Sequence, residues 1–315
     1  MKRIIALLVS CLIMVFIFMR IDFRQFLLYV KEMNFGLLIL AVAFFIPQVA
    51  ITAFRWKELI KHRLHMSLWE STKLILAGNA LNILLPSRMG DLSKAYFLKR
   101  EGKLEIKRGT NIVLFEKYID LASLGIVILT GILFNFQLNQ ANLMGLAYSL
   151  SLIGIFPVLY FLKLDRWVGH PVFEKNKFLS KIKHFLLDAQ QYLLELKKNP
   201  THLTFIILIS IFLWFVHILQ FYVIFLAFHS TVSLFNIFRL APLAILVGLV
   251  PITMAGIGTR DSAMIYFFSP YEAVPKIVGI GVFATLRYFV PGLLGLPFLN
   301  QYIVKDAVET TPSQS

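Results

Sequence analysis

Several apolar stretches of this chain are long enough, or nearly long enough, to cross a lipid bilayer. They cover residues 4–19, 35–54, 142–162 and 203–228. Hydrophobic residues make up 58% of the chain and charged residues only 15%, whereas soluble domains are about half apolar and a quarter charged. We therefore expect an all-α polytopic integral membrane protein.

The formal net charge of +14 raises the question of nucleic-acid binding. The basic residues, however, lie between the apolar stretches, where the positive-inside rule places them. No RNA-binding or helix-turn-helix pattern accompanies them, so no nucleic-acid partner is expected. The basic segments 55–73, 99–108 and 163–200 are assigned to the cytoplasmic side, together with both termini. The expected location is the cell membrane, with multiple passes.

Two apolar segments are interrupted by proline and glycine. Residues 74–98 lie between two cytoplasmic clusters, and a single crossing would put one cluster outside. The simpler prediction is a re-entrant hairpin with Pro86 and Gly90 at its tip, since broken backbone survives at membrane depth only inside protein or beside a wet cavity. The segment 236–268 is broken at Pro251 and by two glycines. It predicts a second hairpin that enters from the opposite face.

The two hairpin regions resemble each other at an offset of 170 residues. The matched positions include Gly78 with Gly248, Asp91 with Asp261, Lys117 with Arg287, and Tyr118 with Tyr288. Weak internal repeats with broken apolar segments are typical of transporters whose site lies at the repeat interface. We expect about six full spans plus two re-entrant hairpins, arranged as two inverted repeats. The expected divisions are a single integral membrane domain over 1–305, repeats at 35–134 and 203–303, and a polar C-terminal tail over 306–315.

Within the third basic segment, residues 178–196 place apolar side chains at helical spacing. This pattern fits an amphipathic helix that lies along the inner leaflet. It fits a connector helix packed on the bundle equally well.

The hairpins carry candidate ligands for an anionic headgroup. Arg88 supplies a planar guanidinium near an expected helix start, where free N–H groups and the helix dipole also favour anions. Arg260 lies at the corresponding turn of the second hairpin, beside two glycines that let a ligand approach the backbone. The hairpin candidates are Asn82, Arg88, Asp91, Gly256, Gly258, Arg260 and Asp261. The alternative for both hairpins is a structural corner in which an Arg–Asp pair only fixes the turn.

Three further candidates, Glu116, Asp120 and Arg287, lie in apolar spans. Ionisable residues inside a membrane are costly and mark function by default. Glu116 and Asp120 share a helix face, and one of them is expected to neutralise Arg287 across the repeat interface. The alternative for Glu116 is a solvated place at the membrane interface. His217 is interpreted as a packing histidine rather than a proton relay.

Motifs for several chemistries are missing from the sequence. It contains no Walker A motif, no zinc-protease helix motif and no serine nucleophile elbow. His62 and His65 lack the further ligands that a zinc site needs. We therefore expect no cofactor, no metal and no nucleotide hydrolysis.

The order of these motifs resembles a known family. The pattern is Asn82-x3-Pro86-x-Arg88-x-Gly90-Asp91, then Glu116-x3-Asp120, then Pro251-x4-Gly256-x-Gly258-x-Arg260-Asp261. It resembles the lysylphosphatidylglycerol synthase transmembrane region, a flippase-like membrane family, over roughly residues 5–300. Mild departures are the aspartates at 91 and 261, where that family often has glutamate, and Lys117, where it often has arginine.

The resemblance implies translocation of a lipid between leaflets. In two-domain synthases such a region is followed by a soluble aminoacyl-transferase domain; this chain stops at Ser315 without one, so synthesis of lysyl-lipid is not expected. Stand-alone relatives are often linked to polyprenyl-phosphate sugars or other glycolipids. The resemblance thus points to an anionic or polyprenyl-phosphate-linked lipid as the substrate.

The sequence and the resemblance together predict a non-enzymatic lipid flippase or lipid-headgroup transporter. Its expected partners are membrane lipids and enzymes of envelope synthesis. The main alternative is an integral-membrane glycosyl- or acyl-transferase, or its accessory subunit, in which Asp91 or Glu116 would serve as a base. A scaffold for an envelope-synthesis complex is a third hypothesis, and the paired charged hairpins speak against it.

Overall fold

The computed structural model describes residues 2–85, 90–134, 140–161, 177–250 and 252–309. Within these ranges the chain forms helices and short turns and no strand, which confirms the all-α class. The helices are α1 (Lys2–Arg20), α2 (Phe23–Glu32), α3 (Phe35–Ala43), α4 (Phe45–Ile60), α5 (Leu68–Leu84), α6 (Ser93–Arg100), α7 (Ile106–Phe134), α8 (Gln140–Phe161), α10 (Lys177–Lys197), α11 (Pro200–Ala227), α12 (Leu234–Gly248), the 3₁₀ helix η3 (Met254–Gly256), α13 (Thr259–Phe268), α14 (Val274–Ala284) and α15 (Leu286–Glu309).

Three stretches of the described chain are long and apolar enough to cross a membrane. They are Phe35–Ile60, Pro200–Ala227 and Val274–Tyr302. The first is α3 followed by α4, and its break at Phe44 lies one turn before Pro47, which has no N–H to donate back. The third is α14 followed by α15, broken at Thr285. These stretches support a multi-pass membrane protein, while the full set of six spans stays a prediction.

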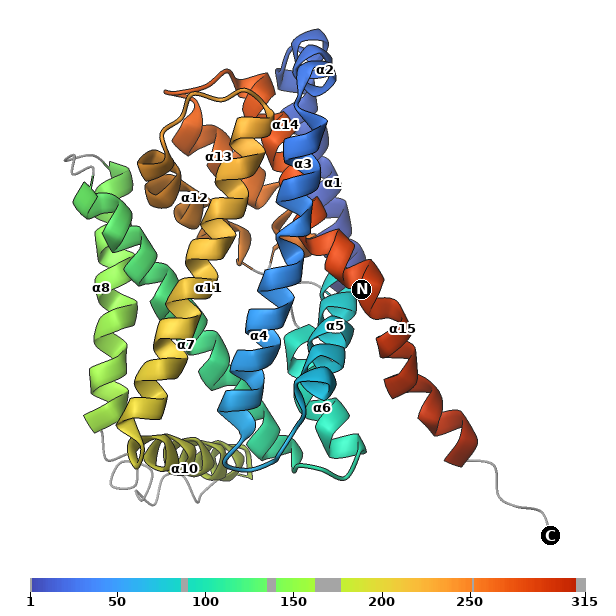
Figure 1. Ribbon diagram of the computed structural model, residues 1–315, viewed down its shortest axis with the longest axis vertical. Helices are drawn as coiled ribbons and strands as arrows, with labels where there is room; N and C mark the ends of the chain where they lie inside the picture. The colour runs from blue at the N-terminus through green and yellow to red at the C-terminus, as the bar shows by residue number, and fades with distance from the viewer. Residues whose placement is uncertain (1, 86–89, 135–139, 162–176, 251, 310–315) are drawn as a thin grey trace.

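Two helical hairpins, α5–α6 and α12–α13, occupy opposite halves of the molecule (Figure 1). In the first, Lys103 after α6 forms an ion pair with Glu70 in the first turn of α5, with 3.2 Å between Nζ and Oε1. In the second, Glu272 after α13 accepts a hydrogen bond of 2.6 Å from Ser230, which precedes α12. Each segment therefore starts and finishes at the same end of the molecule.

Local sequence sets the limits of the hairpin helices. Ser67 Oγ accepts the N–H of Glu70 at 3.1 Å, and the Glu70 carboxylate accepts the N–H of Ser67 at 2.8 Å. This capping box starts α5 at Leu68, earlier than the predicted residue 74. In the second hairpin, Gly256 and Gly258 have φ of +75° and +92°. Glycine adopts such values without strain, so the chain can turn sharply from η3 into α13.

Counterpart positions of the two hairpins lie in similar places. A Cβ added to Gly78 on α5 would lie 3.5 Å from the carbonyl oxygen of Gly90. A Cβ added to Gly248 on α12 would lie 2.8 Å from Cβ of Arg260. Gly248 and Arg260 are the counterparts of Gly78 and Gly90 at the offset of 170 residues. Both hairpins thus close at the same pair of positions, although the inverted relation of the whole repeats stays a prediction.

The hydrophobic core has two parts, one around each hairpin. One cluster contains α12 and α13 and the other contains α5 and α6, while α7 and α11 contribute to both. Near the boundary, the side chains of Gln48 and Gln220 form a buried hydrogen bond of 3.0 Å between α4 and α11. Buried polar groups need partners, and these two side chains satisfy each other between α4 and α11.

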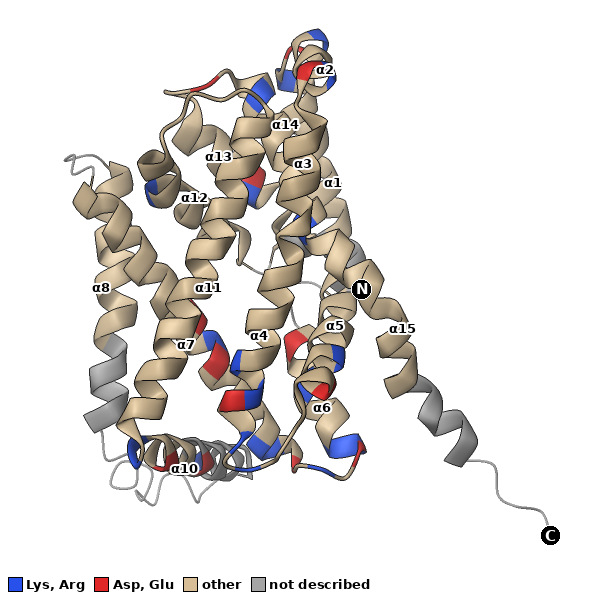
Figure 2. Ribbon diagram, viewed as in Figure 1, with Lys and Arg blue, Asp and Glu red and all other residues tan. Residues whose placement is uncertain are grey.

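Helix α10 lies across the base of the bundle, at the end where many charged residues gather (Figures 1 and 2). Tyr192 is fully buried, and its hydroxyl donates to the carbonyl of Leu59 at 3.0 Å. Arg63 pairs with Glu195 at 3.0 Å. These contacts favour the connector helix packed on the bundle over a helix held by the membrane surface alone.

One predicted boundary is wrong. Arg55, assigned to the cytoplasmic stretch 55–73, lies in α4 and is only 2% exposed. Carboxylates on α7 neutralise its charge inside the protein, and the sequence alone does not reveal that pairing. Helix α15 continues to Glu309, so the first residues of the predicted polar tail at 306–315 are helical.

Candidate functional site

A polar cavity of about 150 Å³ lies between the two hydrophobic clusters. Residues of α4, α5, α6, α7, α11 and α15 line it, together with Asp91 just before α6. The charged side chains that line it are Arg55, Asp91, Lys94, Glu116, Lys117, Asp120 and Arg287. The cavity therefore joins residues of both predicted repeats.

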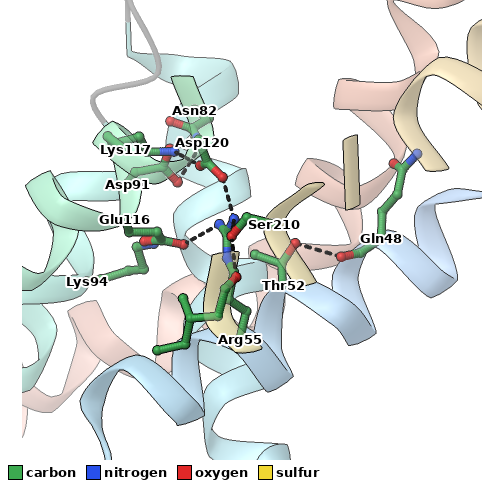
Figure 3. Close-up of polar contacts among 11 residues, drawn as sticks. Gln48, Thr52, Arg55, Asn82, Asp91, Lys94, Glu116, Lys117, Asp120 and Ser210 are labelled. Carbon is green, nitrogen blue, oxygen red and sulfur yellow. Dashed lines mark hydrogen bonds and ion pairs between the residues drawn. The ribbon is translucent and has the colours of Figure 1, made fainter. Parts of the chain in front are cut away.

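Glu116 is held by two cations. Arg55 Nη2 lies 3.0 Å from Glu116 Oε1, and Lys94 Nζ pairs with Oε2. All three side chains are at most 2% exposed. Lys94 also lies 4.4 Å from the ring centroid of Trp56, a cation–π contact. Arg55 donates a further hydrogen bond of 3.0 Å to Ser210, so the group links α4, α6, α7 and α11 (Figure 3).

Asp120, one turn further along α7, joins this group to the first hairpin. It pairs with Arg55, and its second oxygen lies 3.7 Å from Lys117 Nζ. Lys117 also pairs with Asp91, which accepts a hydrogen bond of 3.3 Å from Asn82 (Figure 3). Lys117 is 39% exposed, whereas Arg55 is 2% exposed. The network therefore runs from a fixed buried end to an accessible end at Lys117.

Arg287 of α15 also lines the cavity. Its Nη2 lies 3.3 Å from Nδ1 of His217, and its guanidinium lies 4.7 Å from the ring centroids of Phe221 and Tyr288. Arginine stays protonated and has no acceptor, so Nδ1 of His217 accepts and the proton of the neutral ring is on Nε2. His217, interpreted from sequence as a packing residue, is thus a neighbour of this cation.

The expected pairing of Arg287 with Glu116 or Asp120 is wrong. The ion pairs of these two carboxylates are with Arg55, Lys94 and Lys117. Arg55 and Lys94 come from segments that the sequence prediction assigned to a loop and to a hairpin. Once folded, they supply the positive charge that the carboxylates need. Glu116 is 1% exposed, which also excludes the solvated alternative for this residue.

The second-hairpin candidates lie outside the cavity lining. Arg260 Nη2 pairs with Asp261 Oδ1 at 2.6 Å, and Asp261 Oδ2 accepts the N–H of Gly258 at 2.9 Å. Helix α1 covers this turn, since Ser10 Oγ accepts the N–H of Met254 at 2.8 Å. These contacts favour the structural corner for the second hairpin. Arg88 of the first hairpin lies outside the described residues.

The cavity thus brings together five of the predicted residues: Asn82, Asp91, Glu116, Asp120 and Arg287. Sequence reasoning missed Arg55 and Lys94. Lys94 lies inside the predicted hairpin and Arg55 directly follows the apolar run 35–54. Both are ionisable residues in or beside a predicted membrane segment, and that is the signal that could have identified them.

Comparison with known proteins identifies the family. The sequence profile of the family described as the lysylphosphatidylglycerol synthase TM region matches residues 3–295. A UPF0104 membrane protein of Methanocaldococcus jannaschii is 23% identical over 332 residues, covering 98% of this chain and 96% of that protein. A UPF0104 membrane protein of Methanothermobacter thermautotrophicus is 26% identical over 223 residues, 65% of this chain and 66% of that protein. Because the family profile matches most of the length of this chain, the chain belongs to the lysylphosphatidylglycerol synthase transmembrane region family.

Proposed function

We propose that this protein moves an anionic, phosphate-bearing lipid or lipid-linked sugar between the leaflets of the cell membrane, with the headgroup held in the polar cavity. The observation that carries the proposal is the charge of the lining. The described lining contains four cations, Arg55, Lys94, Lys117 and Arg287, and three carboxylates, Asp91, Glu116 and Asp120. One positive charge is in excess, and a singly charged phosphodiester would neutralise it.

The charged residues of the lining come from two parts of the chain. Three cations and three carboxylates form the ion-pair network of α4, the first hairpin and α7, and Arg287 of α15 lies in the same lining. A guanidinium fork matches phosphate geometry and can bind two phosphate oxygens at once. His217 and Tyr288 beside it offer further hydrogen-bonding groups. We therefore place the phosphate against Arg287, with headgroup hydroxyls facing Asn82 and Thr52.

The size of the cavity fits a headgroup rather than a whole lipid. About 10–15 Å³ of cavity volume is enough to hold one water molecule, so a cavity of about 150 Å³ has room for a phosphate and a small polar group. The apolar tails would stay in the bilayer. The two hairpins, which turn back from opposite halves of the molecule, support an inverted-repeat transporter in which both are re-entrant. Without a nucleotide motif, movement is downhill or driven by an ion gradient.

A transport assay tests the proposal. Purified protein is reconstituted into vesicles that contain fluorescent phosphatidylglycerol, and external dithionite bleaches the outer-leaflet probe. We expect the protein to expose inner-leaflet phosphatidylglycerol to bleaching, and Arg287→Met to slow this at least about tenfold, equivalent to about 1.4 kcal/mol. Lys276→Met is the matched control, because Lys276 pairs with Glu272 at 2.9 Å outside the cavity. Bleaching limited to the outer leaflet with wild-type protein would refute the proposal.

The transferase alternative requires a carboxylate that can take a proton from an acceptor hydroxyl. Both oxygens of Glu116 are engaged by cations, and Asp91 pairs with Lys117. This engagement favours binding over general-base catalysis, and we infer that the protein is not an enzyme. Incubation of the purified protein with nucleotide-sugar and lipid, followed by mass analysis of the lipid, distinguishes the two: a glycosylated product would support the transferase.

A further inference from the structure

The break between α14 and α15 leaves one backbone carbonyl without its helical donor. In a continuous helix the N–H of Thr285 would bond to the carbonyl of Gly281, four residues earlier. Here it bonds to the carbonyls of Val282 and Phe283 instead. Helix α14 ends at Ala284 and α15 starts at Leu286, so Thr285 is the hinge between them. A buried carbonyl that loses its donor needs another partner.

Arg260 of the second hairpin provides that partner. Its Nη2 donates to the carbonyl oxygen of Gly281 at 2.6 Å and to the hydroxyl of Thr285 at 3.0 Å. The Thr285 hydroxyl also lies 3.2 Å from the same carbonyl oxygen. One guanidinium thus bonds both to the end of α14 and to the hinge residue itself. Hydrogen bonds from a charged donor are roughly twice as strong as neutral ones.

The arginine is itself held in place. Asp261 Oδ1 accepts from Arg260 Nε at 3.1 Å and from Nη2 at 2.6 Å. Gly281 makes room for this pair, because a Cβ at that position would lie 2.6 Å from Asp261 Oδ1. Arg260 is 1% exposed and Asp261 3% exposed. The second hairpin therefore contacts the hinge through a buried, hydrogen-bonded Arg260–Asp261 pair.

We propose that Arg260 is a positioning residue that fixes the α14–α15 hinge and thereby sets where Arg287 and Tyr288 lie in the cavity wall. These two residues follow Thr285 by two and three positions, so a change of the hinge angle moves them directly. The contact links any movement of the second hairpin to the headgroup site. Arg260 itself is buried and is not among the residues that line the cavity. The claim that this link serves lipid transport rests on the proposed function. The claim that Arg260 positions Arg287 and Tyr288 does not.

Distance measurement across the hinge tests the positioning. Spin labels are placed at exposed Ala273 and Leu293, on either side of Thr285, in a protein whose single cysteine has been removed by Cys11→Ala. Electron–electron resonance should give one narrow distance for the otherwise unchanged protein. We expect Arg260→Gln and Thr285→Val to broaden or shift that distance, and Thr285→Ser, which keeps the hydroxyl, to preserve it.

The matched control is Arg239→Gln. Arg239 is a buried arginine of the same hairpin, and it bonds to Asn236 at 3.1 Å and to Tyr271 at 2.9 Å, away from the hinge. A purely structural role for Arg260 would give the same result in both arginine variants. Equal distance distributions for Arg260→Gln and Arg239→Gln, or no difference between Thr285→Val and Thr285→Ser, would overturn the proposal. If Arg260→Gln does not fold, the comparison of Thr285→Val with Thr285→Ser tests the proposal by itself.

A second measurement separates this proposal from the proposed function. Calorimetric titration with short-chain phosphatidic acid measures the affinity for an anionic headgroup. We expect Thr285→Val to weaken binding about threefold to tenfold and Thr285→Ser to bind like the wild type. If the wild type fails to bind the probe, the proposed function is contradicted, while the hinge distances still decide the role of Arg260.

Discussion

Asp91 of the first hairpin and Lys117 of α7 form an ion pair that ties the hairpin to the following span. Their counterparts at the offset of 170 residues, Asp261 and Arg287, are used differently. Asp261 pairs with Arg260 inside its own hairpin, and Arg287 contacts His217 in the cavity wall. The second hairpin has Arg260 where the first has Gly90. Asp261 therefore finds a cationic partner within its own hairpin. The Asp91–Lys117 pair thus holds the first hairpin against α7, whereas Arg287 contributes a cation to the cavity.

The buried triad of Glu116, Arg55 and Lys94 is expected to be the most sensitive part of the site. Glu116→Gln leaves two cations without their shared counter-charge, and breaking a buried pair in this way costs about 3–5 kcal/mol of stability. Adding Lys94→Met to that variant should restore part of the loss, because the two residues are coupled. Thermal unfolding in detergent measures both effects. Strictly additive losses would show that the triad is not an energetic unit.

The ends of the two hairpins should lie on opposite sides of the membrane. Glu105 follows the first hairpin and Ser269 ends the second, and both are exposed. In the Cys11→Ala background, a membrane-impermeant maleimide added to intact cells should modify Ser269→Cys and not Glu105→Cys. Lysed cells provide the control, since both positions should react there. Modification of both positions in intact cells would contradict the opposite orientation of the hairpins.

The closure of the second hairpin should weaken in acid. Burial of the Glu272 carboxylate opposes ionisation, but hydrogen bonds from Lys276, Ser230 and the N–H of Thr231 outweigh it and lower the pKa of Glu272 below its ordinary value. A lowered pKa stabilises the fold above the ordinary glutamate value of about 4.3, and this contribution is lost as pH falls through the lower folded-state pKa.

We therefore expect Glu272→Gln to lower the unfolding temperature at pH 7 by about 2–4 °C, as a loss of about 1 kcal/mol would. The difference from the wild type should shrink as the pH is lowered below about 4. Glu105→Gln is the control, because Glu105 is exposed and pairs with Arg108 at 3.4 Å on the surface. A difference for Glu272→Gln that stays constant down to acid pH would rule out this linkage.

Apolar length and proline–glycine breaks predicted several of the helices. The predicted span 203–228 matches α11, and the hairpin 236–268 matches α12 to α13 within two residues. The start of the first hairpin was missed because a capping box lies outside the apolar run. The partner of each buried charge was also missed. Arg55 reaches Asp120 across 65 positions of sequence, and periodicity carries no information on such contacts.

The role of Arg260 shows the same limit. Its place beside Asp261 at a glycine-rich turn predicts an anion ligand and a structural corner equally well. Only the fold reveals that its hydrogen bonds go to Gly281 and Thr285 of a broken helix. No sequence signal marks the break at Thr285, because there is no proline between Pro275 and Pro291. Such a break needs a polar side chain from elsewhere to satisfy the released carbonyl.

The central claim is that the cavity holds a phosphate-bearing lipid headgroup against Arg287. Native mass spectrometry of the protein released from mild detergent tests it most directly, because retained lipid is identified by mass. We expect the wild type and Lys276→Met to retain the same phosphate-bearing lipid, and Arg287→Met to lose it. Equal retention of that lipid by Arg287→Met, or wild-type protein that carries only lipids without a phosphate, would contradict the account.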